Sequence, residues 1–174
     1  SGKTMLLHFD VKRQEKSVHV DETTPETYLL EEKRVPNNDK FRKIAREALV
    51  DKNGGDLVMA RALYDHTIDS MKYAKFGSGW GNGDATFACD SARGNCTDYH
   101  SYFIALCRAV DIPARFAIGA AVPSSRDDGG VNGYHCWAEF YAEGKWWPVD
   151  ISEADKYTSL STYYFGHNLE HIPK

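Results

Sequence analysis

The chain has 174 residues and a mass of 19.6 kDa, the size of one domain with a core of its own. Hydrophobic residues make up 42% of the sequence and charged residues 26%, which excludes a wholly disordered chain. The net charge of −4 argues against a protein that binds nucleic acid or an anionic membrane surface. No apolar run approaches the roughly 20 residues that a membrane span needs.

The chain begins at Ser1 without an initiator methionine, a signal peptide or a transit peptide, and we expect it to be a piece of a longer protein. The start of the chain therefore leaves the cellular compartment open. The cysteines form no C-x-x-C pair, and a chain of this size folds without covalent cross-links, so we expect mostly free thiols. The cysteines are Cys89, Cys96, Cys107 and Cys136.

The N-terminal part of the chain predicts little regular structure. Residues 5–20 mix apolar and charged side chains in partial alternation, which is typical of one or two strands. Residues 21–37 are polar, contain prolines and predict a connecting segment. We expect residues 1–37 to be the remnant of a preceding domain and residues 38–174 to form the main domain.

Two helices are predicted next. Asn38 suits the N-cap of a helix over 39–51, in which apolar residues recur at helical spacing. The glycines of 53–55 end that pattern. Asp56 then suits the N-cap of a second helix that continues to about residue 73, with an apolar stripe at steps of three and four.

Glycine occupies every second position of the segment 77–84 as far as Gly83, which is too frequent for a helix or an ordinary strand. The segment does not match a phosphate-binding loop, because no Gly-Lys-Ser/Thr follows it. Two interpretations stay open here: a mobile loop that borders a cleft, and a plain surface turn.

A third helix is predicted over 96–110 and ends before Pro113, because the residue before a proline avoids the helical region. Three strands follow, and Glu143-Gly144 suits a tight hairpin turn between the last two. A polar loop at 123–133 separates the first two strands, and residues 151–174 show no clear period. Helices followed by an antiparallel sheet are typical of an α+β fold. The predicted strands are 114–121, 135–142 and 145–150.

Three residues that could carry chemistry fall at the ends of predicted elements. Cys96 begins a helix, where unpaired N–H groups and the helix dipole favour a thiolate and could hold an oxyanion. His135 opens one strand of the hairpin and Asp150 closes the other, so the antiparallel strands bring them to the same end. The chemistry of this set is a nucleophilic thiolate, a proton-carrying imidazole and an orienting carboxylate. The alternatives are a buried structural cysteine and ordinary surface residues.

Five blocks of the sequence resemble the core of the transglutaminase-like superfamily, in order and at suitable spacing over about residues 60–165. They resemble the bacterial, papain-like members more than the large animal cross-linking enzymes. The blocks are 94–100 (GNCTDYH), 103–108 (FIALCR), 112–115 (IPAR), 133–141 (GYHCWAEFY) and 146–150 (WWPVD).

The resemblance implies a papain-like core, with a catalytic cysteine at a helix N-terminus packed against an antiparallel sheet. Matched residue by residue, it implies that Cys96 is the nucleophile, His135 the proton carrier and Asp150 the orienting acid. Residues 38–174 would then be the catalytic domain. It also implies that Trp80 in the glycine-rich segment could donate its indole N–H to an oxyanion, although a core or groove-wall tryptophan is the simpler interpretation.

Neighbours of these residues receive weaker expectations. Asn95 and Trp137 are candidates for the oxyanion site or the cleft wall, and Glu139, which shares a strand face with His135 and Trp137, is also expected to line the cleft. Cys136 points to the opposite face by strand alternation, so we expect it to be buried and not catalytic.

Asp98 and His100 lie in the first turns of the third predicted helix, close to the candidate nucleophile. We expect both to stabilise the helix start or a neighbouring loop, although His100 is also within reach of the thiol. Arg115 is expected to form a structural ion pair.

The leading functional hypothesis is an enzyme that forms a thioester-type acyl intermediate on Cys96, with a protein or peptide as substrate and without a cofactor. Water as acceptor would make it a peptidase or amidase, and an amine would make it a transglutaminase; the bacterial resemblance favours hydrolysis and an extracytoplasmic location. The second hypothesis is a catalytically idle module that binds a peptide or glycan. The third is a metal site among the cysteines and histidines, for which the ligand spacing is poor.

Overall fold

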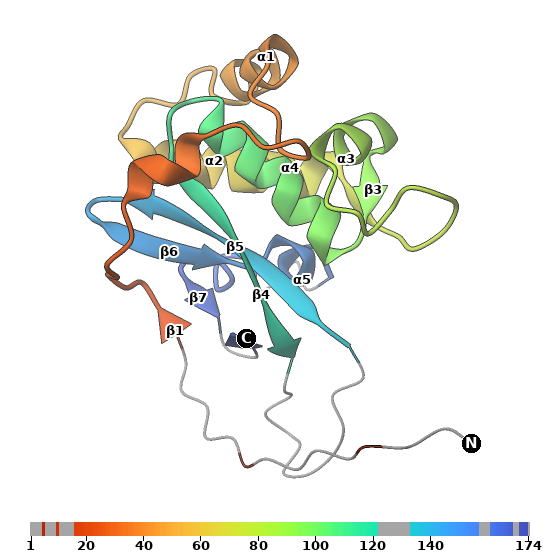
Figure 1. Cartoon of the computed structure of the whole chain (residues 1–174). Helices are drawn as coiled ribbons and strands as arrows, with labels where there is room; N and C mark the ends of the chain where they lie inside the picture. The colour runs from red at the N-terminus through yellow and green to blue at the C-terminus, as the bar shows by residue number, and fades with distance from the viewer. Residues whose placement is uncertain are drawn as a thin grey trace.

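A four-stranded antiparallel sheet with the order β6-β5-β4-β8 carries the fold (Figure 1). The computed structural model describes residues 5, 10, 16–121, 133–156, 161–168 and 171–173. The predicted α+β class is confirmed, and the predicted strands 114–121 and 135–142 are present with those bounds. The strands of the sheet are β4 (Ala114–Ala121), β5 (His135–Ala142), β6 (Lys145–Val149) and β8 (His171–Pro173).

The β5–β6 hairpin turns at Glu143-Gly144, as predicted. Both residues have positive φ, 53° and 76°, which matches the right-handed twist of the two strands. The strand predicted as 145–150 is one residue too long, because pairing ends where Val149 faces Ala138. The next residue, Asp150, leaves the sheet and precedes a helix that the sequence pattern did not predict.

Helix α4 (Cys96–Arg108) forms the centre of the core, and every one of its residues except Thr97 is buried. It packs on the β5 face that carries Phe140, whose ring meets that of Phe103 edge to face at 6.2 Å. In Figure 1, helices α1 to α4 gather over one side of the sheet. The other helices are α1 (Asp39–Ala48), α2 (Asp56–Ser70), α3 (Ala85–Ser91) and α5 (Ile151–Lys156).

The starts of α1 and α2 differ in how they are capped. The predicted cap of α1 is confirmed, because Asn38 Oδ1 accepts the N–H of Phe41 at 3.2 Å. The prediction that Asp56 caps α2 is wrong: Asp56 is the first helical residue, and Gly55 is the N-cap. An acidic side chain is favourable at either place, since it faces the positive end of the helix dipole.

The predicted ends of α1, α2 and α4 extend two or three residues too far. Beyond α2, Met71 turns to an extended conformation, and β2 (Lys72–Tyr73) pairs in parallel with β3 (Arg93–Gly94). This short pair holds the chain before α4 against the end of α2, and it carries Gly94 to the start of α4.

The described part of the N-terminal region packs on the sheet around Arg115. The Arg115 guanidinium forms ion pairs with Asp21 and Glu139, both at 2.6 Å, and stacks on Trp146 with its Cζ 3.9 Å from the ring centroid. The structural ion pair expected for Arg115 is therefore confirmed. The connecting segment contains a 3-10 helix, η1 (Pro25–Leu29).

Of the strands expected within 5–20, the described residues contain β1 (Lys16–Ser17), which pairs with β7 (His167–Asn168). The rest of that prediction, and the loop predicted at 123–133 apart from Gly133, lie outside the described residues. In the part of the chain that the structure covers, no helix is long and apolar enough to cross a membrane. The described cysteines are free, as expected.

Candidate active site

The start of α4 is fixed by a capping box. Asn95 Oδ1 accepts the N–H of Thr97 at 3.0 Å, and Asp98 Oδ2 accepts the N–H of Asn95 at the same distance. Cys96 is the first helical residue, so its own N–H belongs to the turn whose donors have no acceptor within the helix. The sequence thus places a thiol and a backbone donor together at a helix N-terminus.

The glycine-rich loop is tied to the same helix turn. Asp98 also accepts the N–H of Gly81 at 2.6 Å and that of Gly83 at 3.2 Å, so the expectation that Asp98 holds a neighbouring loop is confirmed. Gly83 has a φ of +65°, and a Cβ there would lie 2.9 Å from Thr97 Cγ2. Glycine is therefore required both for the backbone conformation and for the close approach to α4.

The structure places Asn95 and Trp80, two candidates for the oxyanion site, at the start of α4 and in the glycine-rich loop. Asn95 uses its Oδ1 for the helix cap, and its Nδ2 lies 3.4 Å from the hydroxyl of Tyr134. Trp80 is half-buried in the glycine-rich loop, next to Gly81. The loop thus borders the helix start, and the described contacts at that border are made by its backbone.

His135 and Asp150 meet across the hairpin. His135 Nε2 lies 2.7 Å from Asp150 Oδ2, and Asp150 is fully buried. The other carboxylate oxygen, Oδ1, accepts the Ser152 hydroxyl and the Glu153 N–H, both at 3.1 Å, and so caps α5. The carboxylate is therefore held from two sides, with one oxygen directed at the imidazole.

The electrostatics of the site favour a thiolate and an imidazolium. The neighbouring Cys136 thiol is the largest cause that lowers the pKa of Cys96. Burial opposes this effect, and the adjacent His135 lowers the pKa further. Burial opposes the charged form of His135, but hydrogen bonds to Asp150 and Cys96 outweigh it and raise the pKa of His135 to about 10. The structure therefore brings Cys96, His135 and Asp150 together.

Cys136 is buried as expected, but it is not remote from the site. Its thiol donates to the Oγ1 of Thr97 at 3.6 Å, and its proximity to Cys96 lowers the pKa of the Cys96 thiol. Burial and the neighbouring Cys96 raise the pKa of Cys136, so it stays a protonated donor. Strand alternation correctly predicts the strand face on which Cys136 lies. It does not predict that the start of α4 covers this face.

His100 does not reach the Cys96 thiol. Its Nδ1 lies 2.6 Å from the Cys96 carbonyl oxygen, and its Nε2 accepts the N–H of Ile151 at 3.0 Å. Burial lowers the pKa of His100 to about 4, against the raising effect of Asp150 and Cys96. The expectation that His100 stabilises the helix start is confirmed, and the contact with Ile151 was not foreseen.

Two expected cleft residues are buried instead. Trp137 is 1% exposed, and its ring packs beside that of His135 with the centroids 6.5 Å apart. Glu139 is 2% exposed and pairs with Arg115. At Glu139, this strand face is covered by His19 and by Arg115, which also pairs with Asp21, and the strand pattern alone could not reveal these contacts.

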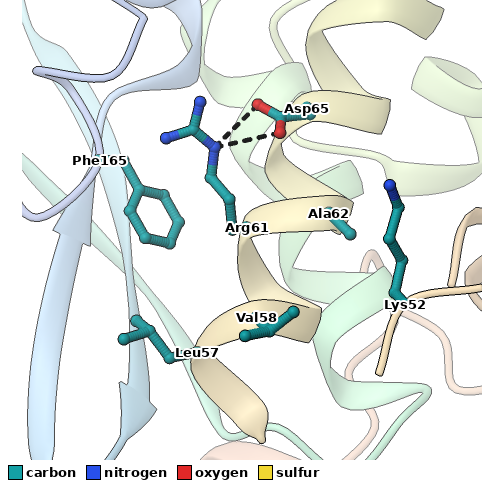
Figure 2. A pocket seen from close by; sticks show the side chains of 7 residues that line it. All are labelled: Lys52, Leu57, Val58, Arg61, Ala62, Asp65 and Phe165. Atoms are coloured by element: carbon teal, nitrogen blue, oxygen red, sulfur yellow. Dashed lines mark hydrogen bonds and ion pairs between the residues drawn. The ribbon is translucent and has the colours of Figure 1, made fainter. Parts of the chain in front are cut away.

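Among the described residues, cavities of about 370 Å³ lie along α4 and beside α2. One extends along α4 from Thr97, the residue after Cys96, towards Tyr28 and Phe116. Figure 2 shows the other, between α2 and Phe165, where Arg61 pairs with Asp65. The cavity along α4 includes Thr97, the residue after Cys96, but neither lining contains Cys96, His135 or Asp150. Within the described residues, no group of three or more His, Cys, Asp or Glu side chains could hold a metal ion.

The sequence matches the model of the transglutaminase-like superfamily over residues 42–151, which is more than half of the chain. The chain belongs to this superfamily. An uncharacterised protein of Haemophilus influenzae is 31% identical to it over 130 residues, which cover 63% of this chain and 35% of that protein. The region that matches the superfamily model, residues 42–151, contains Cys96, His135 and Asp150.

Solved structures share the transglutaminase-like fold. A candidate cysteine protease from Cytophaga hutchinsonii matches 82% of this chain and 45% of its own, with 24% identity and a TM-score of 0.61. The periplasmic domain of TgpA from Pseudomonas aeruginosa matches 81% of this chain and 50% of its own, with 21% identity and a TM-score of 0.56. The chain thus spans about a third to a half of the length of these relatives.

Proposed function

We propose that this transglutaminase-like domain is a cysteine-nucleophile acyl-transfer enzyme that acts on amide bonds of proteins or peptides. The observation that carries the proposal is the buried contact of His135 Nε2 with Asp150 Oδ2 at 2.7 Å, next to a Cys96 thiol of lowered pKa at the start of α4. A structural cysteine needs neither an ionised thiol nor an oriented imidazole beside it.

The first half-reaction consumes the proton that His135 holds. The Cys96 thiolate attacks the carbonyl carbon, and the N–H of Cys96 stabilises the negative charge on the oxygen. The C–N bond then breaks as the leaving amine takes the proton from His135, and a thioester remains on Cys96. Asp150 keeps the His135 ring oriented and stabilises its positive charge before the transfer.

The second half-reaction restores the ion pair. An acceptor that carries a proton attacks the thioester, His135 takes that proton, and the Cys96 thiolate leaves. Water as acceptor makes the domain a peptidase or amidase, and a primary amine makes it a transglutaminase. The fold shared with a candidate cysteine protease supports hydrolysis as the leading alternative.

Two further parts of the proposal concern substrate and location. The cavity along α4 begins at Thr97, the residue after the nucleophile. Its lining combines the apolar Val35, Ile104 and Phe116 with the charged Glu32, Arg34, Arg108 and Arg115, which suits a polypeptide segment with both apolar and polar groups. The similarity to a periplasmic domain supports an extracytoplasmic location.

The test is to trap the acyl-enzyme. Intact-protein mass spectrometry after incubation with an activated acyl ester should show the mass of one acyl group, and peptide mapping should place it on Cys96. Cys96→Ala should abolish the adduct, whereas the matched control Cys89→Ala, which removes a thiol on α3, should retain it.

A peptide library with and without a primary amine then distinguishes the acceptors, because water gives free carboxylates and the amine gives new amides. Absence of both an adduct and any cleaved or joined peptide would overturn the proposal. Peptides that are bound but unchanged would instead support the catalytically idle binding module.

A further inference from the structure

His100 is a fully buried histidine that the acyl-transfer steps do not use. Both of its ring nitrogens contact backbone groups, at opposite sides of the ring. Nδ1 lies 2.6 Å from the carbonyl oxygen of Cys96, and Nε2 lies 3.0 Å from the amide nitrogen of Ile151. One contact is with the residue that carries the nucleophile, and the other with the residue that directly follows Asp150.

The two backbone partners fix the protonation of the ring. A carbonyl oxygen can only accept, so Nδ1 must carry a hydrogen and donate it to Cys96. A backbone N–H can only donate, so Nε2 must be unprotonated and accept from Ile151. His100 is therefore neutral and held as one tautomer. An imidazolium would break the contact with Ile151, because both of its nitrogens donate.

These contacts join the starts of two helices. Cys96 is the first residue of α4, and Ile151 is the first residue of α5, whose cap is Asp150. The ring of His135 lies between the Cys96 thiol and the Asp150 carboxylate, so the distance between these helix starts decides whether it can contact both.

We propose that His100 is a positioning residue that sets this distance: as a neutral bridge, it holds the nucleophile and the acid at the spacing that His135 requires. The inference rests on the proposed function, and it adds a role for a residue that neither attacks the substrate nor transfers a proton.

The charged and titratable groups that face His100 are Cys96 on α4, His135 on β5 and Asp150 before α5, whose Oδ1 is 3.8 Å from His100 Nε2. Asp150 and Cys96 favour a charged ring, whereas burial and His135 disfavour it and prevail. A charged His100 would compete with His135 for the Asp150 carboxylate and would weaken the support of the His135 imidazolium. Burial of the ring disfavours that charge.

Two conservative variants test the two contacts separately. In His100→Asn the amide nitrogen takes the place of Nδ1 and keeps the donor to Cys96, while in His100→Gln the amide oxygen takes the place of Nε2 and keeps the acceptor for Ile151. The matched control is His66→Asn, because His66 is a half-buried helical histidine whose Nε2 contacts Tyr102 and Ser70.

The measurement is the rate of Cys96 alkylation by iodoacetamide from pH 4 to 9, with a melting curve for each variant. We expect at least one His100 variant to react about 10- to 10²-fold more slowly at pH 6, with its profile moved to higher pH, because a small displacement of reacting groups has effects of this size. The His66→Asn control should keep the wild-type profile. Folded His100 variants with the wild-type profile, or an equal change in the control, would overturn the proposal.

A second measurement needs no variant. Nitrogen NMR of the histidine-labelled wild-type protein between pH 5 and 8 should show His100 with a protonated Nδ1 and an unprotonated Nε2. A protonated Nε2 in that range would overturn the bridge, even if every His100 variant failed to fold. If wild-type Cys96 is unreactive but this tautomer is present, the proposed function fails and the bridge between the helix starts stands.

Discussion

Replacing Asp150 by asparagine separates the two contacts of its carboxylate. Oδ1 caps α5 through Ser152 and Glu153, and Oδ2 meets His135 Nε2 at 2.7 Å. The asparagine oxygen preserves the cap, so the fold should survive. The new NH₂ group then faces Nε2, which must accept a hydrogen bond where it previously donated one to the carboxylate.

Exchanging the oxygen and NH₂ positions of the new asparagine amide would not restore the support of His135 without cost. The N–H of Glu153, now 3.1 Å from Oδ1, would face the NH₂ group, and a buried N–H without an acceptor costs about 1–3 kcal/mol. In the favoured orientation His135 is neutral, with its hydrogen on Nδ1, and the buried charge that supports its imidazolium is gone. The pKa of Cys96 should therefore rise.

The size of the loss follows from where the proton lies before attack. The equivalent change in a serine triad lowers kcat about 10⁴-fold, because the histidine must first remove the proton of the serine. A Cys–His ion pair already holds that proton on the histidine, so we expect a smaller loss, about 10- to 10³-fold.

The assay combines turnover of an activated ester, a melting curve and the pH profile of Cys96 alkylation. The melting temperature of Asp150→Asn should change by only a few degrees, since about 1 kcal/mol corresponds to about 2–4 °C at this chain length. Asp155→Asn is the matched control, because Asp155 lies on the helix that Asp150 caps but accepts from the Tyr99 hydroxyl and the Tyr73 N–H. If Asp150→Asn is folded and keeps the wild-type rate and alkylation profile, Asp150 does not support His135.

Three further perturbations test neighbouring contacts. Cys136→Ala removes the neighbouring thiol that lowers the pKa of Cys96, so the midpoint of the Cys96 alkylation profile should move to higher pH; an unmoved midpoint would show that this neighbour is unimportant. His100 has a pKa of about 4 when folded and about 6.5 when unfolded, so the unfolded chain binds more protons between these values. The melting temperature should therefore fall as the pH drops through this window, and less steeply in His100→Asn; equal slopes would contradict the assignment. Gly83→Ala places a Cβ 2.9 Å from Thr97 Cγ2 at a φ of +65°, and urea unfolding should show a loss of about 1–3 kcal/mol, which an unchanged midpoint would refute.

Helical periodicity and turn chemistry predicted the long elements from the sequence. The stripes of α1, α2 and α4 and the Glu143-Gly144 turn are strong local signals, and the structure contains each of them. The short helices were missed, because α3 has seven residues and α5 has six, too few to show a period.

The sequence nevertheless contained a signal for α5. Asp150 followed three residues later by Glu153 has the spacing of an N-cap and a capping-box acid, and the structure uses Asp150 as the cap. The apolar run before Asp150 favoured a longer strand, and that assignment hid the cap.

Part of the candidate site could be predicted because its residues fall at the ends of strong elements. The hairpin brings His135 and Asp150 to the same end of its two strands, and Cys96 lies at the start of α4 beside them. The contact of Cys96 with Cys136 could not be predicted in this way. Alternation assigns a side chain to a strand face, but only tertiary packing determines which part of a helix covers that face.

The proposed acyl transfer depends most directly on Cys96 being an ionised thiol at neutral pH. Burial raises the pKa of Cys89, Cys107 and Cys136, whereas that of Cys96 is lowered. Iodoacetamide at pH 6, followed by peptide mapping over time, compares all four in one sample of folded protein. We predict that Cys96 is labelled at least about tenfold faster than each of the others, since only the thiolate reacts. Equal labelling of the four cysteines, or faster labelling of Cys89, would contradict an activated nucleophile at Cys96.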